Sequence, residues 1–164
     1  MEQKEKIRGY RNNNPLNIRY NASNNWAGRV TIDKSDSQFE EFISLYDGYR
    51  AAFVLLNNYI NKYGFRTIRE IISKWAPTSE NNTESYIVYV CNYSGIKEDA
   101  TLYFSNPVMM IPIVIAMTMV ECGEVRSVEP ILRAYLCVYA EKHPFEGKRD
   151  MFWSARFWDL IKRN

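Results

Sequence analysis

Apolar side chains recur at helical spacing through most of the chain from residue 49 onward. From Tyr49 they lie three or four positions apart, which places them along one face of a helix that Gly64 ends. Thr67 and Glu70 have the spacing of a capping box, which predicts a helix to about Trp75. The remaining predicted helices are Glu84–Asn92, Pro107–Glu121, Val128–Glu141 and Asp150–Lys162.

The first 42 residues lack this period. Residues 1–28 are predicted to form an irregular, asparagine-rich segment with one helical turn near Pro15. The stretches GRVTID and SQFEEF resemble short strands on either side of a polar turn, which predicts a small hairpin at Arg29–Phe42. The pattern is that of a mainly α protein with a minor β component (α+β). Without repeats or a linker, the 164 residues are expected to form one domain, 1–164.

Charge narrows the classes of partner. The net charge is only +2, and no helix is strongly basic, which argues against a dedicated nucleic-acid-binding protein. The first 30 residues nevertheless hold six Lys and Arg residues against two Glu residues. This uneven distribution could meet an anionic polymer such as nucleic acid, teichoic acid or cell-wall glycan.

The cysteines and the apolar runs exclude further classes. Cys91, Cys122 and Cys137 have neither disulfide nor metal-ligand spacing, and the single histidine, His143, cannot build a zinc site alone. We expect no metal and no organic cofactor. The N-terminus lacks the apolar core of a secretory signal. The most apolar run, Val108–Val120, has 13 residues, so no integral membrane segment is expected.

Glu121 is the residue most suited to catalysis. It ends the long apolar helix, and Gly123 follows it closely. If the carboxyl group faces a cleft, desolvation raises its pKa, and glycosidic cleavage needs an acid that is still protonated near neutral pH. The alternative, which spacing alone favours, is that Glu121 marks the point where the helix reaches water.

Three more acids are candidates for the same cleft. Glu40 and Glu41 are adjacent on the predicted hairpin strand, so alternation sends them to opposite faces. One of them could act as a second carboxylate, although two exposed charges on an edge strand are the commoner arrangement. Glu80, in the SENNT loop, could cap the next helix or bind a backbone amide.

Several motifs resemble a family of phage and prophage virion proteins that are thought to have a lysozyme-like, muralytic fold. The similarity covers residues 8–124, and its most specific parts are RGYRNNNPLNIRYN and WAPTSEN. Where that family has Asn-Pro-Gly-Asn-Ile and Glu-Asn-Gly, this chain has Leu16 and Cys122 in place of the glycine and the asparagine. The resemblance implies helices around a glycan cleft.

A more distant resemblance is to flagellar-type glucosaminidases and lytic transglycosylases. In those enzymes a helix-end Glu comes first, and a cleft tyrosine, similar to Tyr86 here, comes late. In this chain Glu121 follows all the other motifs, so the order could be circularly permuted. That hypothesis requires Glu121 to lie within about 10 Å of Tyr86 and of the Asn12–Asn17 segment.

The resemblance also suggests how a glycan would be bound. The amides of Asn12, Asn13, Asn14 and Asn17 would form one wall of the cleft, because amides both donate and accept hydrogen bonds. Arg11 and Arg19 could meet peptide-stem carboxylates or muramyl lactyl oxygens, and Trp26 matches a Trp-x-Gly motif of the cleft. Asparagines also hold irregular loops, and we expect at least two of the four to do so.

These observations favour a peptidoglycan-cleaving glycosidase or lytic transglycosylase, with Glu121 as general acid and base and Tyr86 as its partner. The alternative is a phage structural or glycan-binding protein that has the same fold but no catalytic activity. Its partners would be other virion proteins. Such a protein would reside in the bacterial cytoplasm or the virion and reach the wall after delivery. An aromatic stripe in residues 152–161 could dock a partner or a membrane, or pack on the core. The oligomeric state stays open.

Overall fold

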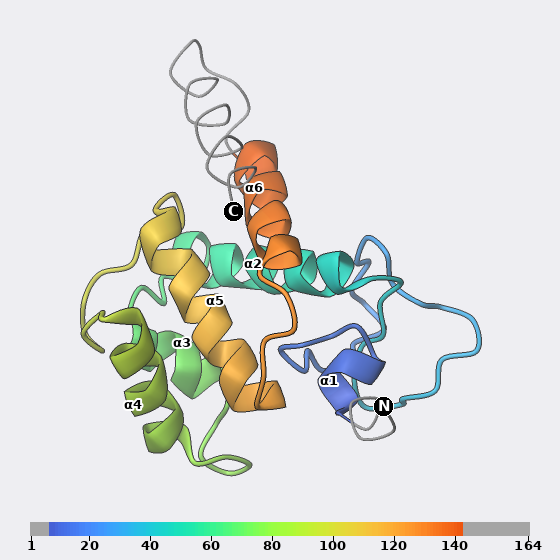
Figure 1. Ribbon diagram of the computed structural model, residues 1–164, viewed down its shortest axis with the longest axis horizontal. Coiled ribbons are helices and arrows are strands. Elements are labelled where there is room, and N and C mark those ends of the chain that lie inside the picture. The colour runs from blue at the N-terminus through green and yellow to red at the C-terminus, as the bar shows by residue number, and fades with distance from the viewer. Residues whose placement is uncertain (1–6, 143–164) are drawn as a thin grey trace.

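The computed structural model describes residues 7–142, which fold into helices joined by irregular segments (Figure 1). The helices of these residues are α1 (Arg8–Arg11), α2 (Leu45–Asn61), α3 (Ile68–Trp75), α4 (Thr83–Ser94), α5 (Pro107–Cys122) and α6 (Glu129–Lys142). The mainly helical prediction is confirmed, and α2 to α6 match the predicted helices within a few residues. The predicted helix 150–162, its aromatic stripe and His143 lie outside the described residues.

Local capping signals account for the helix boundaries. The Thr67 hydroxyl accepts from the Glu70 amide while the Glu70 carboxylate accepts from the Thr67 amide, which is the predicted capping box. The side chains of Ser44, Asn82 and Asn106 cap α2, α4 and α5 more simply, since each accepts one hydrogen bond from a backbone N–H of the first turn. Gly123 ends α5 with a φ of 74°, a conformation that favours glycine.

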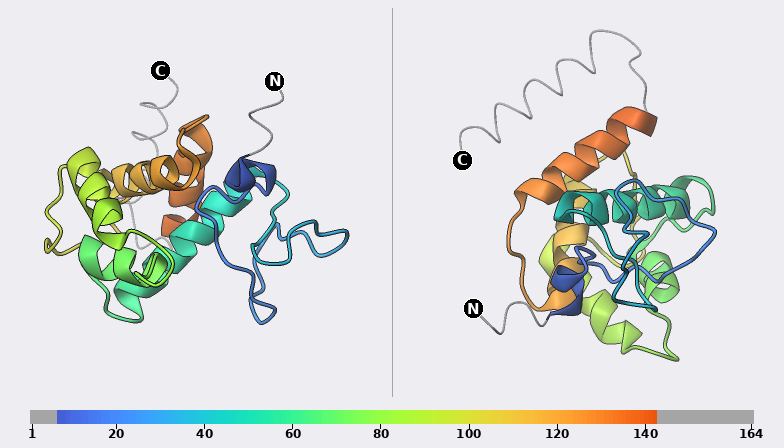
Figure 2. Two further views of the ribbon diagram at one scale, coloured as in Figure 1. Left: turned by 90° about the horizontal axis from the view of Figure 1, so that it is seen from below. Right: turned by 90° about the vertical axis from the view of Figure 1, so that its right-hand side faces the viewer.

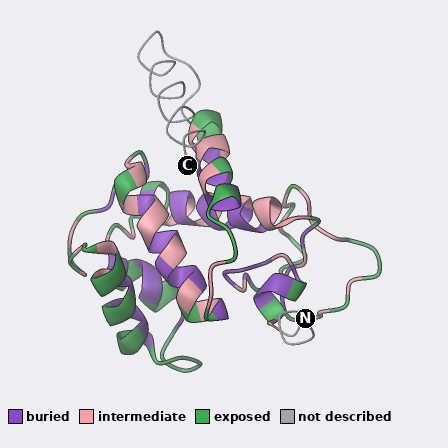
Figure 3. Ribbon diagram, viewed as in Figure 1, coloured by how far each residue is buried: buried purple, intermediate pink, exposed green. Residues whose placement is uncertain are grey.

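The core lies where the long helices cross. α6 packs on α2, α4 packs on α5, and buried residues line the facing surfaces (Figure 3). An aromatic cluster in this core consists of Phe53 of α2, Tyr135 of α6 and Phe104, which precedes α5. Phe53 meets the other two rings edge to face, and those two are tilted against each other. The C-terminal end of α5 lies between α4 and the N-terminal segment (residues 7–43), as Figure 1 and the left view of Figure 2 show.

The predicted hairpin at Arg29–Phe42 is reduced to one antiparallel bridge between these two residues, because no regular strand forms in residues 7–142. The antiparallel pairing is confined to single residues, Arg19 opposite Phe39 and Arg29 opposite Phe42. Residues 38–43 thus pair with residues 18–20 on one side and with residues 28–30 on the other. Between the two bridges, the Glu40 backbone amide donates to the Ile18 carbonyl, and the fully buried Glu40 side chain forms an ion pair with Arg29.

The predicted helical turn near Pro15 is also displaced. The turn forms earlier, at α1, and Pro15 lies in a tight turn that packs on other elements. A Cβ atom on Gly48 of α2 would lie 1.9 Å from the Asn13 carbonyl oxygen. A Cβ atom on Gly9 would lie 2.5 Å from the Cys122 sulfur at the end of α5. The N-terminal segment therefore fits closely over both long helices.

Gly48→Ala tests this close fit. In an exposed helix interior the change would stabilise the protein by up to about 1 kcal/mol, because alanine is the better helix former. Here the added methyl group would collide with backbone, so we expect a loss of about 1–3 kcal/mol in the free energy of unfolding. Urea denaturation followed by circular dichroism measures the difference, and a more stable variant would contradict the packing.

Candidate active site

Glu121 occupies the last turn of α5, next to the end of the helix at Gly123. The helix before it is apolar and has Met110, Val114 and Met117 fully buried, so the carboxyl group is attached to a segment that lies inside the protein. Its side chain is partly buried where α5 meets α4 and the N-terminal segment (Figure 1). The carboxyl group thus lies at a junction of three parts of the chain.

Two side chains from distant parts of the sequence hold this carboxyl group. The Asn17 amide donates from Nδ2 to Oε2 of Glu121 over 2.8 Å. The Tyr86 hydroxyl lies 3.1 Å from Oε1. Both distances are well below the limit of about 10 Å that the hypothesis of a circular permutation requires.

Asn17 is held in place from both sides. Its backbone is in the left-handed conformation, with a φ of 50°, and its N–H donates to the Asn14 carbonyl. The Arg8 Nε donates to Asn17 Oδ1 over 3.3 Å. Since the amide oxygen faces Arg8, the amide nitrogen is directed at Glu121.

Tyr86 lies in the first turns of α4 and is 4% exposed. The start of α4 is anchored by the Asn82 cap and by the Thr83 hydroxyl, which donates to the Ala76 carbonyl over 2.6 Å. Burial and the nearby Glu121 carboxyl raise the pKa of Tyr86 well above its usual range. The phenol therefore remains protonated and can donate to Glu121.

Burial raises the pKa of Glu121 above its ordinary value, while the hydrogen bonds from Asn17 and Tyr86 and the charge of Arg8 partly oppose that rise. Its place at the negative end of the α5 dipole also disfavours the anion. Because the Asn17 amide nitrogen can only donate, Oε2 must accept, so the proton of the neutral acid belongs on Oε1. The Tyr86 hydroxyl donates to Oε1 of the carboxylate and can turn to accept from Oε1 of the neutral acid. This arrangement suits a general acid.

The other predicted asparagines hold the N-terminal segment together. Asn14 is fully buried, and its amide bonds the backbone of Ile18 and Glu40. Asn12 donates to Asp36, and Asn13 donates to the carbonyls of residues 42 and 43. The expectation that at least two of the four are structural is met, and the geometry favours that role over glycan binding for these three.

Glu40 and Glu41 face opposite sides, as predicted, but within residues 7–142 neither forms a hydrogen bond with a group that contacts Glu121. The Arg29 guanidinium binds both oxygens of the fully buried Glu40, at 2.9 and 3.0 Å. Glu41 accepts from the Ser35 hydroxyl and the Asp36 amide. The expectation of two exposed edge charges is wrong for Glu40, since the ion pair compensates its burial. Both carboxylates are engaged within their own segment.

The remaining predicted residues lie around the site in different ways. Arg19 forms an exposed ion pair with Glu80 at 2.5 Å, which links the N-terminal segment to the loop before α4. Glu80 therefore does not cap α4, whose cap is Asn82. Trp26 packs against the core, and its buried Nε1 has no hydrogen-bond partner among the described residues.

Sequence reasoning missed the residues that fasten the N-terminal segment. Arg8 orients Asn17, and the Trp75 indole donates to the Leu16 carbonyl over 3.2 Å. The Cys122 thiol donates to the Pro15 carbonyl over 3.2 Å. Leu16 and Cys122, which depart from the motifs of the resembling family, each take part in one of these two hydrogen bonds. No spacing or motif in the sequence indicated them.

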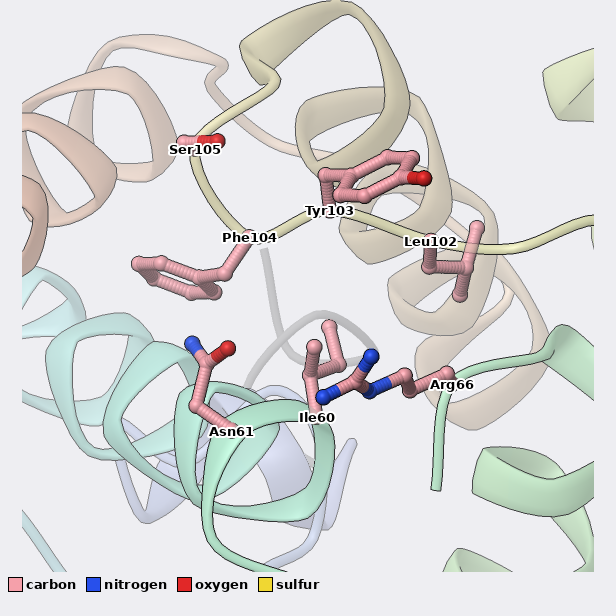
Figure 4. Close-up of a pocket in the computed structure, with 7 residues that line it drawn as sticks. All are labelled: Ile60, Asn61, Arg66, Leu102, Tyr103, Phe104 and Ser105. Carbon is pink, nitrogen blue, oxygen red and sulfur yellow. The ribbon is translucent and has the colours of Figure 1, made fainter. Parts of the chain in front are cut away.

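Other sites in the described part of the chain offer no comparable chemistry. A pocket of about 260 Å³ lies at the far end of α2, lined by none of the predicted site residues (Figure 4). Its lining residues are Ile60, Asn61, Arg66, Leu102, Tyr103, Phe104 and Ser105. Within residues 7–142 no three potential ligand side chains gather as a metal site, and no helix is long and apolar enough to cross a membrane.

Comparison with known proteins shows that part of this chain is similar in sequence to a phage protein. No family model matches the sequence. A stretch of 100 residues, 60% of this chain, is 44% identical to Protein P5 of Pseudoalteromonas phage PM2. The match spans 62% of the length of Protein P5. The chain is therefore similar to a phage protein over part of its length, and it spans less than two thirds of that protein.

The raised pKa of Glu121 predicts a pH-dependent effect of Glu121→Gln on stability. A raised folded-state pKa stabilises the protein only while the group is protonated, and this contribution is lost as the pH rises through the folded pKa. The glutamine keeps the shape and stays neutral. We therefore expect a higher Tm than the wild type at pH 7 and a difference that shrinks towards pH 4.

Differential scanning calorimetry across that pH range makes the measurement. Glu124→Gln is the matched control, because Glu124 lies past the helix end and pairs with Arg126. A Tm difference for Glu121→Gln that does not change with pH would contradict the raised pKa.

Proposed function

We propose that this chain is a phage protein that cleaves the glycan strands of bacterial peptidoglycan, with Glu121 as the general acid. The proposal depends on the carboxyl group of Glu121. Burial raises the pKa of this group, and Asn17 and Tyr86 orient it. Glycosidic cleavage needs such an acid at the leaving oxygen. The similarity to a phage protein supports only the phage part of the proposal.

Among residues 7–142, none of the three candidate acids is left available as a second carboxylate, which favours a transglycosylase over a hydrolase. A hydrolase of the usual kind places two carboxyl groups about 5–10 Å apart across the bond. Here Glu40, Glu41 and Glu80 bond to groups of their own segments or to Arg19. A reaction with one carboxyl group requires a nucleophile from the substrate itself.

The chemistry then proceeds in two proton transfers. Oε1 of Glu121 gives its proton to the glycosidic oxygen as the bond from that oxygen to the muramyl C1 breaks. The C6 hydroxyl of the same muramyl residue attacks C1, and its proton passes to the Glu121 carboxylate. The product is an anhydromuramyl end, and the acid is restored. The Tyr86 hydroxyl stabilises the carboxylate between the two steps.

A second candidate is a catalytically silent phage structural or glycan-binding protein. One observation favours it: both oxygens of Glu121 are already bonded within the protein, so the residue could serve only to join α5 to α4 and the N-terminal segment. The similarity to Protein P5 supports the phage part of both candidates and no step of the cleavage. In this case the virion would use the fold to hold glycan or a neighbouring subunit.

Incubation of the purified protein with peptidoglycan separates the two candidates. We expect the wild type to release anhydromuramyl fragments, identified by mass spectrometry. Glu121→Gln should reduce release by about 10²–10⁴-fold, which is the usual contribution of a general acid. Glu124→Gln should release fragments at the wild-type rate.

Each other outcome has a distinct meaning. Reducing ends in the products would replace the transglycosylase by a hydrolase. Equal release by the wild type and Glu121→Gln would remove Glu121 from the mechanism. No release by a folded wild-type protein, with glycan still bound, would favour the silent protein.

A further inference from the structure

Arg8 differs from the other arginines of the N-terminal segment in its partners. The others pair with acids: Arg11 with Asp36, Arg19 with Glu80 and Arg29 with Glu40. Arg8 forms no ion pair with any carboxylate of residues 7–142. Its side chain is exposed to solvent. It is therefore a positive charge that the described part of the fold does not neutralise.

Arg8 is nevertheless held in a defined position. Its guanidinium carbon lies 3.7 Å from the centre of the Phe39 ring, and its Nε donates to Asn17 Oδ1. These contacts leave the two terminal nitrogens, Nη1 and Nη2, without a hydrogen-bond partner among the described residues. A planar guanidinium with both terminal nitrogens available binds carboxylates in a bidentate manner.

Arg19 contacts the same aromatic ring as Arg8. Its guanidinium carbon is 4.8 Å from the centre of the same Phe39 ring, so two positive charges share one aromatic ring. Its present partner, the Glu80 carboxylate, shows that the group can hold a carboxylate. Both side chains of that pair are more than half exposed, so the pair is weak and a ligand carboxylate can replace Glu80.

This pair of charges is joined to the candidate acid through one residue. Arg8 bonds Asn17, and Asn17 bonds Glu121. A glycan whose linkage lies at Glu121 would bring the substituents of the neighbouring sugar to the arginines. In cell-wall glycan that substituent is the lactyl group of muramic acid, which ends in a carboxylate or continues into a peptide with carboxylates of its own.

We infer that Arg8, together with Arg19 on the same Phe39 ring, binds a carboxylate of the substrate and makes the site select muramic acid-containing glycans over neutral chitin-type glycans. This inference rests on the proposed function and adds the basis of its selectivity. Chitin-type glycans consist of N-acetylglucosamine alone and offer no carboxylate to the two arginines. The amide and hydroxyl contacts around Glu121 would not by themselves distinguish the two polymers.

Equilibrium binding to the full chain carrying Glu121→Gln tests the inference without turnover. Isothermal titration compares chitotetraose, a peptide-free cell-wall tetrasaccharide with lactyl carboxylates, and the same tetrasaccharide with peptide stems. We expect at least one acidic ligand to bind about tenfold more tightly than chitotetraose, as one charge-assisted contact provides. Adding Arg8→Gln should abolish the preference, and Arg8→Lys should restore only part of it.

Arg66→Gln is the matched control, since it removes the same charge from the pocket near the opposite end of α5, roughly 20 Å from Glu121 (Figure 4). It should keep the full preference. Tight binding of the peptide-free ligand would identify the lactyl carboxylate as the bound group, and tight binding only of the stem-bearing ligand would identify the peptide.

Equal affinity for all three ligands, or a preference that survives Arg8→Gln, would overturn the inference and leave the proposed cleavage intact. A folded protein that binds none of the three would overturn the inference together with the glycan-directed function. Release of fragments from peptidoglycan is measured separately, so the two failures remain distinguishable.

Discussion

The hydrogen bonds of the Glu121 carboxyl group connect parts of the chain that lie 104 and 35 residues apart in sequence. A carboxyl group at the end of an apolar helix is costly to bury without partners. The fold provides Asn17 from the N-terminal segment and Tyr86 from α4, and both must be in place before the group is satisfied. The arrangement of α5, α4 and the N-terminal segment can therefore be understood from this one requirement.

The N-terminal segment lacks regular secondary structure and is nevertheless well fastened. Buried amides, above all Asn14, take the place of a strand ladder by bonding the backbone on both sides. The buried ion pair of Glu40 and Arg29 lies within the same segment. Gly9 of α1 and Gly48 of α2 have no side chain, which lets the Cys122 sulfur and the Asn13 carbonyl oxygen approach closely. Rigidity of this kind is what a site needs if a side chain such as Asn17 is to orient a catalytic carboxyl group.

Sequence patterns anticipated what depends on local chemistry. The capping box at Thr67 and the glycine after α5 fixed helix boundaries because their partners lie within four residues. The closeness of Glu121 and Tyr86 was anticipated from the order of motifs in a resembling family. The buried ion pair of Glu40 and Arg29 and the shortness of the pairing around it were not anticipated, because both depend on tertiary packing. The same holds for Arg8, whose role depends on the distant ring of Phe39.

The central claim is that the fold keeps the Glu121 carboxyl group protonated at a higher pH than an ordinary glutamate. A titration of the side-chain carboxyl ¹³C resonances by NMR, with Glu121→Gln to assign the signal, measures this directly. We expect a Glu121 midpoint clearly above the ordinary glutamate pKa of about 4.3. A midpoint at or below that value would show that the hydrogen bonds and Arg8 outweigh burial, and Glu121 would then be a structural anion and not a general acid.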